Sequence, residues 1–534
     1  MPISAHLIIL PILLPMAAGA VLLLLDEKRY QFKALISLVS VLLTLIISLF
    51  LCREAALLSP KAYAYQLGNW PAPFGINLLL DRLSALMLSL VSVLALASLL
   101  FARAYWQKAG PRFHVFIQFF ISGLNGVFLT GDLFNLFVFF EIMLTASYAL
   151  ALHGAGIART KAGLHYVVVN LVASVFFLLG TALVYGSLGT LNFADIAQKI
   201  PTLQGTNQSI FTIGATLLGI AFLTKAAMWP LNFWLVPTYS AASAPAACFF
   251  AILSKVGIYT ILRLTLLCFR SQNSTLAHFG QSFLYWGGLA TLIFGFIGVL
   301  ASQNLGRLAS YHVLVSSGTL LMAIGLNHNA LLTGILFYLI SSTLALAAFF
   351  LLVELIERGQ DTAANVLAIT QDVYGEDEEE PEIEIGTYIP GTIALLGASF
   401  GIVAILLIGM PPLSGFLGKF MLFNQALTPQ GLIDAPGTPR FQDWLFVILI
   451  LLSGFLSLIA LSRAGIRIFW AAKEGIVPRV QVIEFAPIVG LIFLCALLSI
   501  AAGSVVNYLD ALSHDVQQPQ NYIHSVLSLE ETDP

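Results

Sequence analysis

The chain has 534 residues, of which 59% are hydrophobic and only 10% are charged, and its net charge is −3 at pH 7. A soluble domain carries about 25% charged residues, so this composition excludes a soluble globular protein and indicates a polytopic membrane protein. The net charge itself says little, and no basic patch indicates a nucleic-acid partner. The four cysteines stand apart in apolar stretches without ligand spacing, so we expect neither a metal site nor a cofactor.

The chain is divided into long apolar segments, and a membrane-spanning helix needs about 20 such residues. Fourteen segments qualify, which predicts an all-α polytopic membrane protein. The predicted spans are 4–25, 32–51, 77–102, 113–131, 133–152, 162–186, 208–228, 243–268, 280–302, 307–326, 329–355, 390–426, 443–469 and 483–508. The twelfth is too long for one helix, and Pro411 and Pro412 divide it into two half-helices.

The distribution of basic residues predicts the orientation. If the loop 26–31 lies in the cytoplasm, alternate loops and their flanks hold fourteen Lys and Arg residues, against six on the opposite side. The positive-inside rule then places both termini on the non-cytoplasmic side of a bacterial inner (cell) membrane. Residues 356–389 contain the run EDEEEPEIE and are predicted to form a solvated cytoplasmic loop, with a docking surface for a basic partner as the alternative. We expect a short interfacial helix within 187–207 and a flexible polar tail over 509–534.

Two spans combine a proline break with a lysine. The seventh runs through Lys225 into Trp229-Pro230, and the twelfth runs through Pro411-Pro412 to Lys419. Interrupted helices in corresponding halves are typical of transporters built from inverted repeats, although proline is also simply common in membrane helices. The spacing predicts five-helix repeats over spans 4–8 and 9–13. The resulting parts are 1–112, the first repeat 113–268, the second repeat 269–469 with the acidic loop 356–389, and the last helix with the polar tail, 470–534.

Four charged residues lie inside apolar spans: Glu141, Lys225, Lys255 and Lys419. A charge at the bilayer centre costs about 2.5–3.5 kcal/mol, so such residues usually face the bundle interior and move ions or protons. The alternatives are a structural ion pair for Glu141 and lysines that extend to the membrane surface. His312, in the tenth span, is the best histidine candidate for a switchable proton site, with a packing role as the alternative.

The sequence around these residues resembles the antiporter-like proteins shared by respiratory complex I, membrane-bound hydrogenases and Mrp-type cation/proton antiporters. The resemblance covers nearly the whole chain, and the D subunits of Mrp antiporters (also called Pha or Mnh) are the most similar group. It rests on FFEIML around Glu141, FLTKAAMWPLNFWLVPTYSAASAP at 222–245, LSKVGIYTILR at 253–263, GMPPLSGFLGKF at 409–420 and WPAPFGINLLLDRLSALM at 70–87.

The resemblance implies a proton path through Glu141, Lys225, Lys255 and Lys419 in one subunit of a multisubunit Na⁺(K⁺)/H⁺ antiporter, a secondary transporter and not an enzyme. The implied partners are the lipid bilayer, protons, monovalent cations and subunits of the A, B, C, E, F and G types. We expect Glu141 to stabilise the protonated form of Lys225, whose proton then passes through water to Lys255. The alternatives are a proton-pumping membrane subunit of a redox complex and a structural scaffold with vestigial charges.

One departure from the family lies in the eleventh span. Many relatives carry a His and a Lys there, where this chain reads Tyr338-Leu339-Ile340-Ser341-Ser342-Thr343-Leu344-Ala345-Leu346. The hydroxyl groups of Ser341, Ser342 and Thr343 can organise water but carry no charge. The connection from Lys255 to Lys419 is therefore expected to depend on water or on His312.

Overall fold

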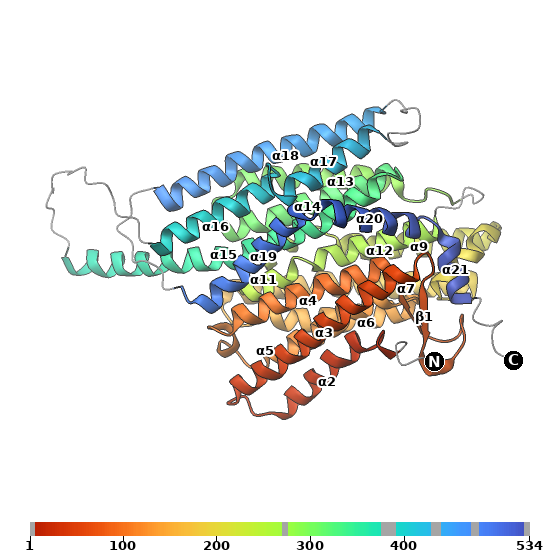
Figure 1. Ribbon diagram of the computed structural model, residues 1–534, viewed down its shortest axis with the longest axis horizontal. Helices are drawn as coiled ribbons and strands as arrows, with labels where there is room; N and C mark the ends of the chain where they lie inside the picture. Colours follow the sequence, from red (N-terminus) through yellow and green to blue (C-terminus); the bar gives the residue numbers. More distant parts are fainter. Residues whose placement is uncertain (1–5, 270–275, 375–390, 429–438, 471–479, 528–534) are drawn as a thin grey trace.

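The computed structural model describes residues 6–269, 276–374, 391–428, 439–470 and 480–527. Long, roughly parallel helices form most of the structure (Figure 1). Within the described residues, twelve helices are long and apolar enough to cross a membrane. The prediction of an all-α polytopic membrane protein is thereby confirmed. Two further apolar helices are shorter, and they coincide with the first and fourth predicted spans: Leu10–Leu24 and Phe113–Leu129.

The elements follow one another with short connections. In chain order they are α2 (Leu10–Leu24), α3 (Tyr30–Leu58), β1 (Tyr63–Gln66), η1 (Leu67–Asn69), β2 (Asn77–Leu80), α4 (Arg82–Ala102), η2 (Trp106–Lys108), α5 (Phe113–Leu129), α6 (Leu133–Ala151), α7 (Ile157–Leu188), α8 (Phe193–Lys199), η3 (Ile200–Thr202), α9 (Gly205–Lys225), α10 (Leu235–Ala241), α11 (Ala244–Phe250), α12 (Leu253–Cys268), α13 (Gln281–Ala301), α14 (Leu305–Leu326), α15 (Leu331–Tyr374), α16 (Gly391–Ile408), α17 (Ser414–Leu427), α18 (Phe441–Gly465), η4 (Ile466–Trp470), α19 (Val482–Ile500), α20 (Ala502–Val516) and α21 (Pro519–Leu527).

A two-stranded antiparallel sheet replaces the start of the third predicted span. β1 pairs with β2 in the register Tyr63↔Leu80 and Gln66↔Asn77, so the expectation of a helix from residue 77 is wrong. The helix α4 begins only at Arg82, because Asp81 caps it: the Asp81 carboxylate accepts from the Ser84 N–H at 2.8 Å, and the Ser84 hydroxyl accepts from the Asp81 N–H at 3.0 Å.

The eighth predicted span consists of two helices. α11 ends at Phe250 and α12 begins at Leu253, so Lys255 lies in the first turn of α12. Lys255 still lies near the middle of the spanning segment Ala244–Cys268. The other two breaks are confirmed, since α9 ends at Lys225 and α16 ends at Ile408. The spanning windows of the segments Ala244–Cys268 and Leu331–Arg358 are buried completely, which makes them the centre of the bundle.

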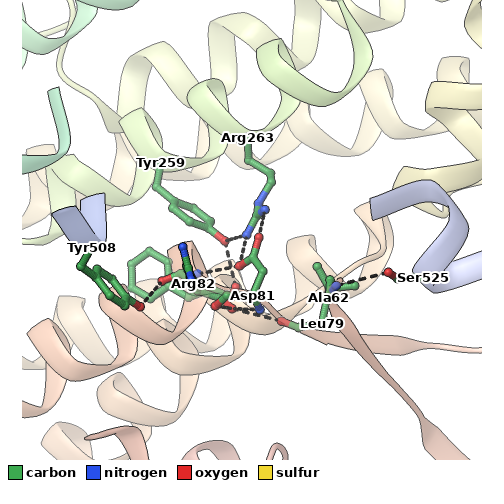
Figure 2. Close-up of polar contacts among 10 residues, drawn as sticks. Ala62, Leu79, Asp81, Arg82, Tyr259, Arg263, Tyr508 and Ser525 are labelled. Carbon is green, nitrogen blue, oxygen red and sulfur yellow. Dashed lines mark hydrogen bonds and ion pairs between the residues drawn. The ribbon is translucent and has the colours of Figure 1, made fainter. Parts of the chain in front are cut away.

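The C-terminal region differs from its prediction. A spanning helix is present in the last predicted span, 483–508, but it ends earlier, since α19 ends at Ile500. In place of the predicted flexible tail, α20 and α21 pack back onto the bundle. Asp515 accepts from the Ser59 hydroxyl at 2.8 Å, and the Ser525 hydroxyl accepts from the Ala62 N–H at 3.2 Å (Figure 2). The tail is thus ordered as far as residue 527 because its polar side chains bond to the α3–β1 connection.

Two other connecting segments were predicted. The prediction of a loop over 356–389 is wrong for its first part, because α15 continues as a helix to Tyr374. The acidic run EDEEEPEIE lies outside the described residues. The short helix expected within 187–207 is present as α8.

Candidate functional site

The three intramembrane lysines are all buried. Lys255 is 0% exposed, Lys225 is 4% exposed and Lys419 is 6% exposed, whereas Glu141 is half-buried. Neither Lys225 nor Lys419 extends to the surface. The alternative that these two lysines extend to the membrane surface is therefore excluded. Each ammonium group has polar partners inside the protein, and the three sets of partners differ in kind.

Glu141 and Lys225 bond to successive turns of one helix, α7, and not to each other. The Ser174 hydroxyl donates to Glu141 Oε1 at 2.5 Å, and Lys225 Nζ donates to Asn170 Oδ1 at 2.8 Å. Asn170 and Ser174 are four residues apart, so both side chains lie on the same face of α7. Glu141 nevertheless lies near enough for its charge to act on Lys225 across this gap.

The carboxyl end of α9 is held by three other elements. Trp229 N–H donates to the Thr291 hydroxyl of α13 at 2.8 Å, and Trp234 Nε1 donates to the Thr224 carbonyl at 3.1 Å. The second bond satisfies one of the carbonyls that a helix end leaves free. Gly257 of α12 lies so close that a Cβ atom there would be 2.7 Å from the Phe222 carbonyl oxygen. The contact brings the helix of Lys255 against the end of the helix of Lys225.

Lys255 begins a chain of hydroxyl groups that crosses the centre of the bundle. Its Nζ donates to the Ser316 hydroxyl of α14 at 2.7 Å. Ser316 donates in turn to the Ser342 hydroxyl of α15 at 3.0 Å. Because a hydroxyl group both donates and accepts, this arrangement can pass a proton from one oxygen to the next.

A small cavity lies beyond Ser342, between α14, α15 and the break of the twelfth span. It has a volume of about 20 Å³ and is lined by Ser316, Ser342, Ser341 and His312 on one side and by Leu407 and Gly415 on the other. This volume accommodates one water molecule.

The predicted accessory residues differ in where their polar atoms lie. His312 donates from Nδ1 to the Leu308 carbonyl at 2.9 Å, which leaves the buried Nε2 without a partner. Ser341 donates to the Ser414 hydroxyl of α17 at 2.8 Å. Thr343 bonds to the Leu339 carbonyl of its own helix at 2.6 Å. The structure therefore brings His312, Ser341 and Ser342 to the cavity, and Thr343 is not among its lining residues.

Lys419 bonds to main-chain carbonyls at the end of α16. Its Nζ donates to the Ile408 carbonyl at 2.7 Å and lies 3.4 Å from the Leu407 carbonyl. Gly409, with φ +81°, turns the chain at this point, and a side chain there would collide with Lys419 Cδ at 2.6 Å. The site needs glycine for both reasons.

Asn170, Ser174, Ser316 and Ser414 are polar partners that were not predicted. For the first two a signal was present: they are isolated polar residues four positions apart in the apolar run VVVNLVASVFF. Serines are common in membrane helices, so Ser316 and Ser414 carried no comparable signal.

A buried ion pair lies at the end of the bundle that carries β1 and α21. The Arg263 guanidinium donates to both Asp81 oxygens and to the Tyr259 hydroxyl, and Tyr259 donates to the Phe128 carbonyl at 2.9 Å (Figure 2). Burial raises the pKa of Asp81, but the Arg263 charge outweighs it, and the pKa of Asp81 lies below its usual value. Asp81 therefore both caps α4 and pairs with Arg263, and the pairing was not predicted.

Comparisons with known proteins agree with this architecture. The family model described as "NADH:quinone oxidoreductase/Mrp antiporter, TM" matches residues 130–433, a range that contains Glu141 and all three lysines. The D subunit of a probable K(+)/H(+) antiporter of Rhizobium meliloti (strain 1021) is 53% identical over 532 residues and covers 98% of each chain. The D subunit of the Na(+)/H(+) antiporter of Bacillus subtilis (strain 168) is 32% identical over 528 residues, covering 98% of this chain and 99% of that protein. A chain in the structure of the Mrp complex from Dietzia sp. DQ12-45-1b shares the fold, with a TM-score of 0.81 and 22% identity over 99% of this chain and 100% of that one.

Proposed function

The chain belongs to the NADH:quinone oxidoreductase/Mrp antiporter family, and on this basis we propose that it is the proton-translocating subunit of a multisubunit Na⁺(K⁺)/H⁺ antiporter. The observation that carries the proposal is the buried hydroxyl chain from Lys255 through Ser316 to Ser342. It starts at an ammonium group that is 0% exposed. The chain provides exchangeable protons between this ammonium group and α15.

The first step takes place at Lys225. A buried ammonium is tolerated because compensating charges and dipoles surround it, and here these are Asn170 and the more distant Glu141. When Glu141 is neutralised, Lys225 loses this compensation and releases its proton. The proton then passes toward Lys255, whose helix touches the end of α9 at Gly257.

The second step crosses the centre of the bundle. A proton on Lys255 passes to Ser316 and Ser342, through one water molecule in the cavity to Ser341, and from there to Ser414 and Lys419. Each hydroxyl accepts one proton and donates another, so no intermediate carries a separated charge for long. His312, with its unpartnered Nε2, lies beside the water position and is an alternative acceptor. This route replaces the charged residues that many relatives have in the eleventh span.

We also propose a topology of fourteen spans, counting the shorter helices α2 and α5 with the twelve longer ones. Helices 4–8 and 9–13 then form inverted repeats over 113–268 and 269–469. The two breaks support this, because each contains a residue in the left-handed region, Ala227 with φ +57° and Gly409 with φ +81°. Both termini lie on the non-cytoplasmic side of the bacterial inner membrane, and the partners are subunits of the A, B, C, E, F and G types.

The test is exchange of Na⁺ or K⁺ for protons in everted vesicles that contain the whole complex. Glu141→Gln keeps the shape of the side chain and removes its charge, so it is expected to abolish the cation-dependent change in ΔpH while the complex still assembles. Retained exchange in Glu141→Gln vesicles refutes the proposal. Co-purification with flavin and iron–sulfur subunits, in contrast, would indicate the proton pump of a redox complex.

A further inference from the structure

The ammonium group of Lys419 is held differently from that of Lys225. Lys225 bonds to a side-chain amide and lies in the field of a carboxylate. Lys419 bonds only to the main-chain carbonyls of Ile408 and Leu407. Among the described residues, no carboxylate oxygen lies within 4.0 Å of Lys419 Nζ. A positive ion is therefore held at this position by neutral oxygen atoms.

These carbonyls are available because the helix ends there. The N–H groups of Gly409 and Met410 both return to the Ile405 carbonyl, at 3.0 and 3.1 Å, which leaves the Leu407 and Ile408 carbonyls to Lys419. The carboxyl end of a helix carries a partial negative charge of about half an electron. The break in α16–α17 thus points two unused carbonyl oxygens, and the negative end of a dipole, at one buried position.

Beside the carbonyls lies a small cavity that has both polar and apolar lining residues. The cavity of about 20 Å³ reaches Leu407 and Gly415, and Ser341 lines it from the opposite side. On α18, Gly454 faces the carbonyls: a Cβ atom there would lie 3.1 Å from the Ile408 oxygen and 3.5 Å from Lys419 Nζ. A small ion beside the carbonyls therefore meets no side chain at Gly454.

We propose that the carboxyl end of α16 is a monovalent-cation site, at which Na⁺ or K⁺ competes with the ammonium group of Lys419. Carbonyls at the ends of broken helices coordinate Na⁺ in transporters, and rings of carbonyls replace the hydration shell of K⁺ in channels. When Lys419 loses its proton, the neutral amine gives up the carbonyls and one cation takes its place. One proton leaves for each cation bound, so the charge of the site stays constant.

This inference rests on the proposed function, because Lys419 must exchange its proton for the site to open. His312 of α14 lies within electrostatic range of Lys419. Tyr338 of α15 lines the same cavity as His312, and Cys495 of α19 bonds to Ser414 at the start of α17. The Ile408 carbonyl of α16 and Gly454 of α18 lie against the Lys419 ammonium group. His312→Gln therefore tests whether the imidazole, and not the lysine, sets the pH dependence.

The experiment measures equilibrium binding of radioactive sodium and rubidium to the purified whole complex at about pH 6 and about pH 9, on either side of the range in which a perturbed lysine titrates. The wild type is expected to bind one more cation per complex at the higher pH. Lys419→Met leaves the carbonyls free, so that cation is expected to bind at both pH values. Lys419→Arg keeps a permanent positive charge, so the cation is expected to be missing at both. Gly454→Val places side-chain atoms against both the Ile408 carbonyl and Lys419 Nζ and is expected to weaken binding tenfold or more.

Equal cation binding by Lys419→Met and Lys419→Arg overturns the cation site, as does pH dependence that disappears in His312→Gln. Lys255→Met separates this outcome from failure of the proposed function. It is expected to abolish antiport and to keep the pH-dependent cation. If Lys255→Met vesicles still exchange protons, the proposed proton path is wrong, whatever the binding data show.

Discussion

Ser316 offers the sharpest test of the hydroxyl chain, because its neighbour in sequence provides a matched control. The Ser316 hydroxyl accepts from Lys255 Nζ at 2.7 Å and donates to Ser342 at 3.0 Å. A hydrogen bond to a charged group contributes about 1.5–3 kcal/mol. At about 1.4 kcal/mol per factor of ten in rate, Ser316→Ala is expected to lower the antiport rate by about 10- to 150-fold.

Ser317 is the control, since its hydroxyl is equally buried but has no hydrogen-bond partner. Ser317→Ala is expected to leave the rate unchanged, because it removes no bond. The assay is the initial rate of cation-dependent ΔpH dissipation in everted vesicles, divided by the amount of assembled complex. If Ser316→Ala keeps more than half of the wild-type rate, or if both variants lose activity equally, proton transfer does not pass through Ser316.

Three further predictions concern stability and are measured by thermal unfolding of the purified complex. Gly257→Ala places a Cβ atom 2.7 Å from main-chain atoms of α9 and should destabilise the protein by about 1–3 kcal/mol; an unchanged Tm would show that the two helices separate freely. Ala227→Gly should stabilise it by about 1 kcal/mol, because Ala227 holds φ +57°, and a lower Tm would contradict this. Asp81→Asn leaves Arg263 without its partner and should cost about 3–5 kcal/mol. The pKa of Asp81 is lowered in the folded protein. The stability difference between the wild type and Asp81→Asn is therefore fully present above about pH 4, and it should shrink as the pH falls through the lowered pKa of Asp81. A stability difference that grows on acidification would contradict the Asp81–Arg263 ion pair.

The positions of the charged residues could be predicted because the bilayer makes charge expensive. A lysine inside an apolar span has few explanations, and Lys225, Lys255 and Lys419 are indeed buried inside the protein. The breaks at α9 and α16 were predictable for a similar reason, since proline cannot continue a helix. Strong local penalties of this kind are visible in sequence alone.

The partners of these residues were less predictable, because they arise from packing between helices. Asn170 and Ser316 are ordinary polar residues in membrane helices, and only the fold shows that they face Lys225 and Lys255. The strand Asn77–Leu80 is apolar enough to resemble the start of a span. The Gly and Pro residues of 67–76 mark a turn, but they do not show that this strand pairs with Tyr63–Gln66. The structure also places Arg263 inside α12 against Asp81, a pairing between distant segments that the sequence did not indicate.

The central claim is that protons cross this subunit through its buried lysines, and Lys255 tests it most directly. Lys255→Met keeps the length of the side chain and removes its charge, while Lys161→Met removes an exposed lysine of α7 as a control. The measurement is ΔpH dissipation by Na⁺ or K⁺ in everted vesicles that contain equal amounts of assembled complex. The proton path predicts that Lys255→Met abolishes exchange and that Lys161→Met retains it. Exchange at the wild-type rate in Lys255→Met would contradict the path.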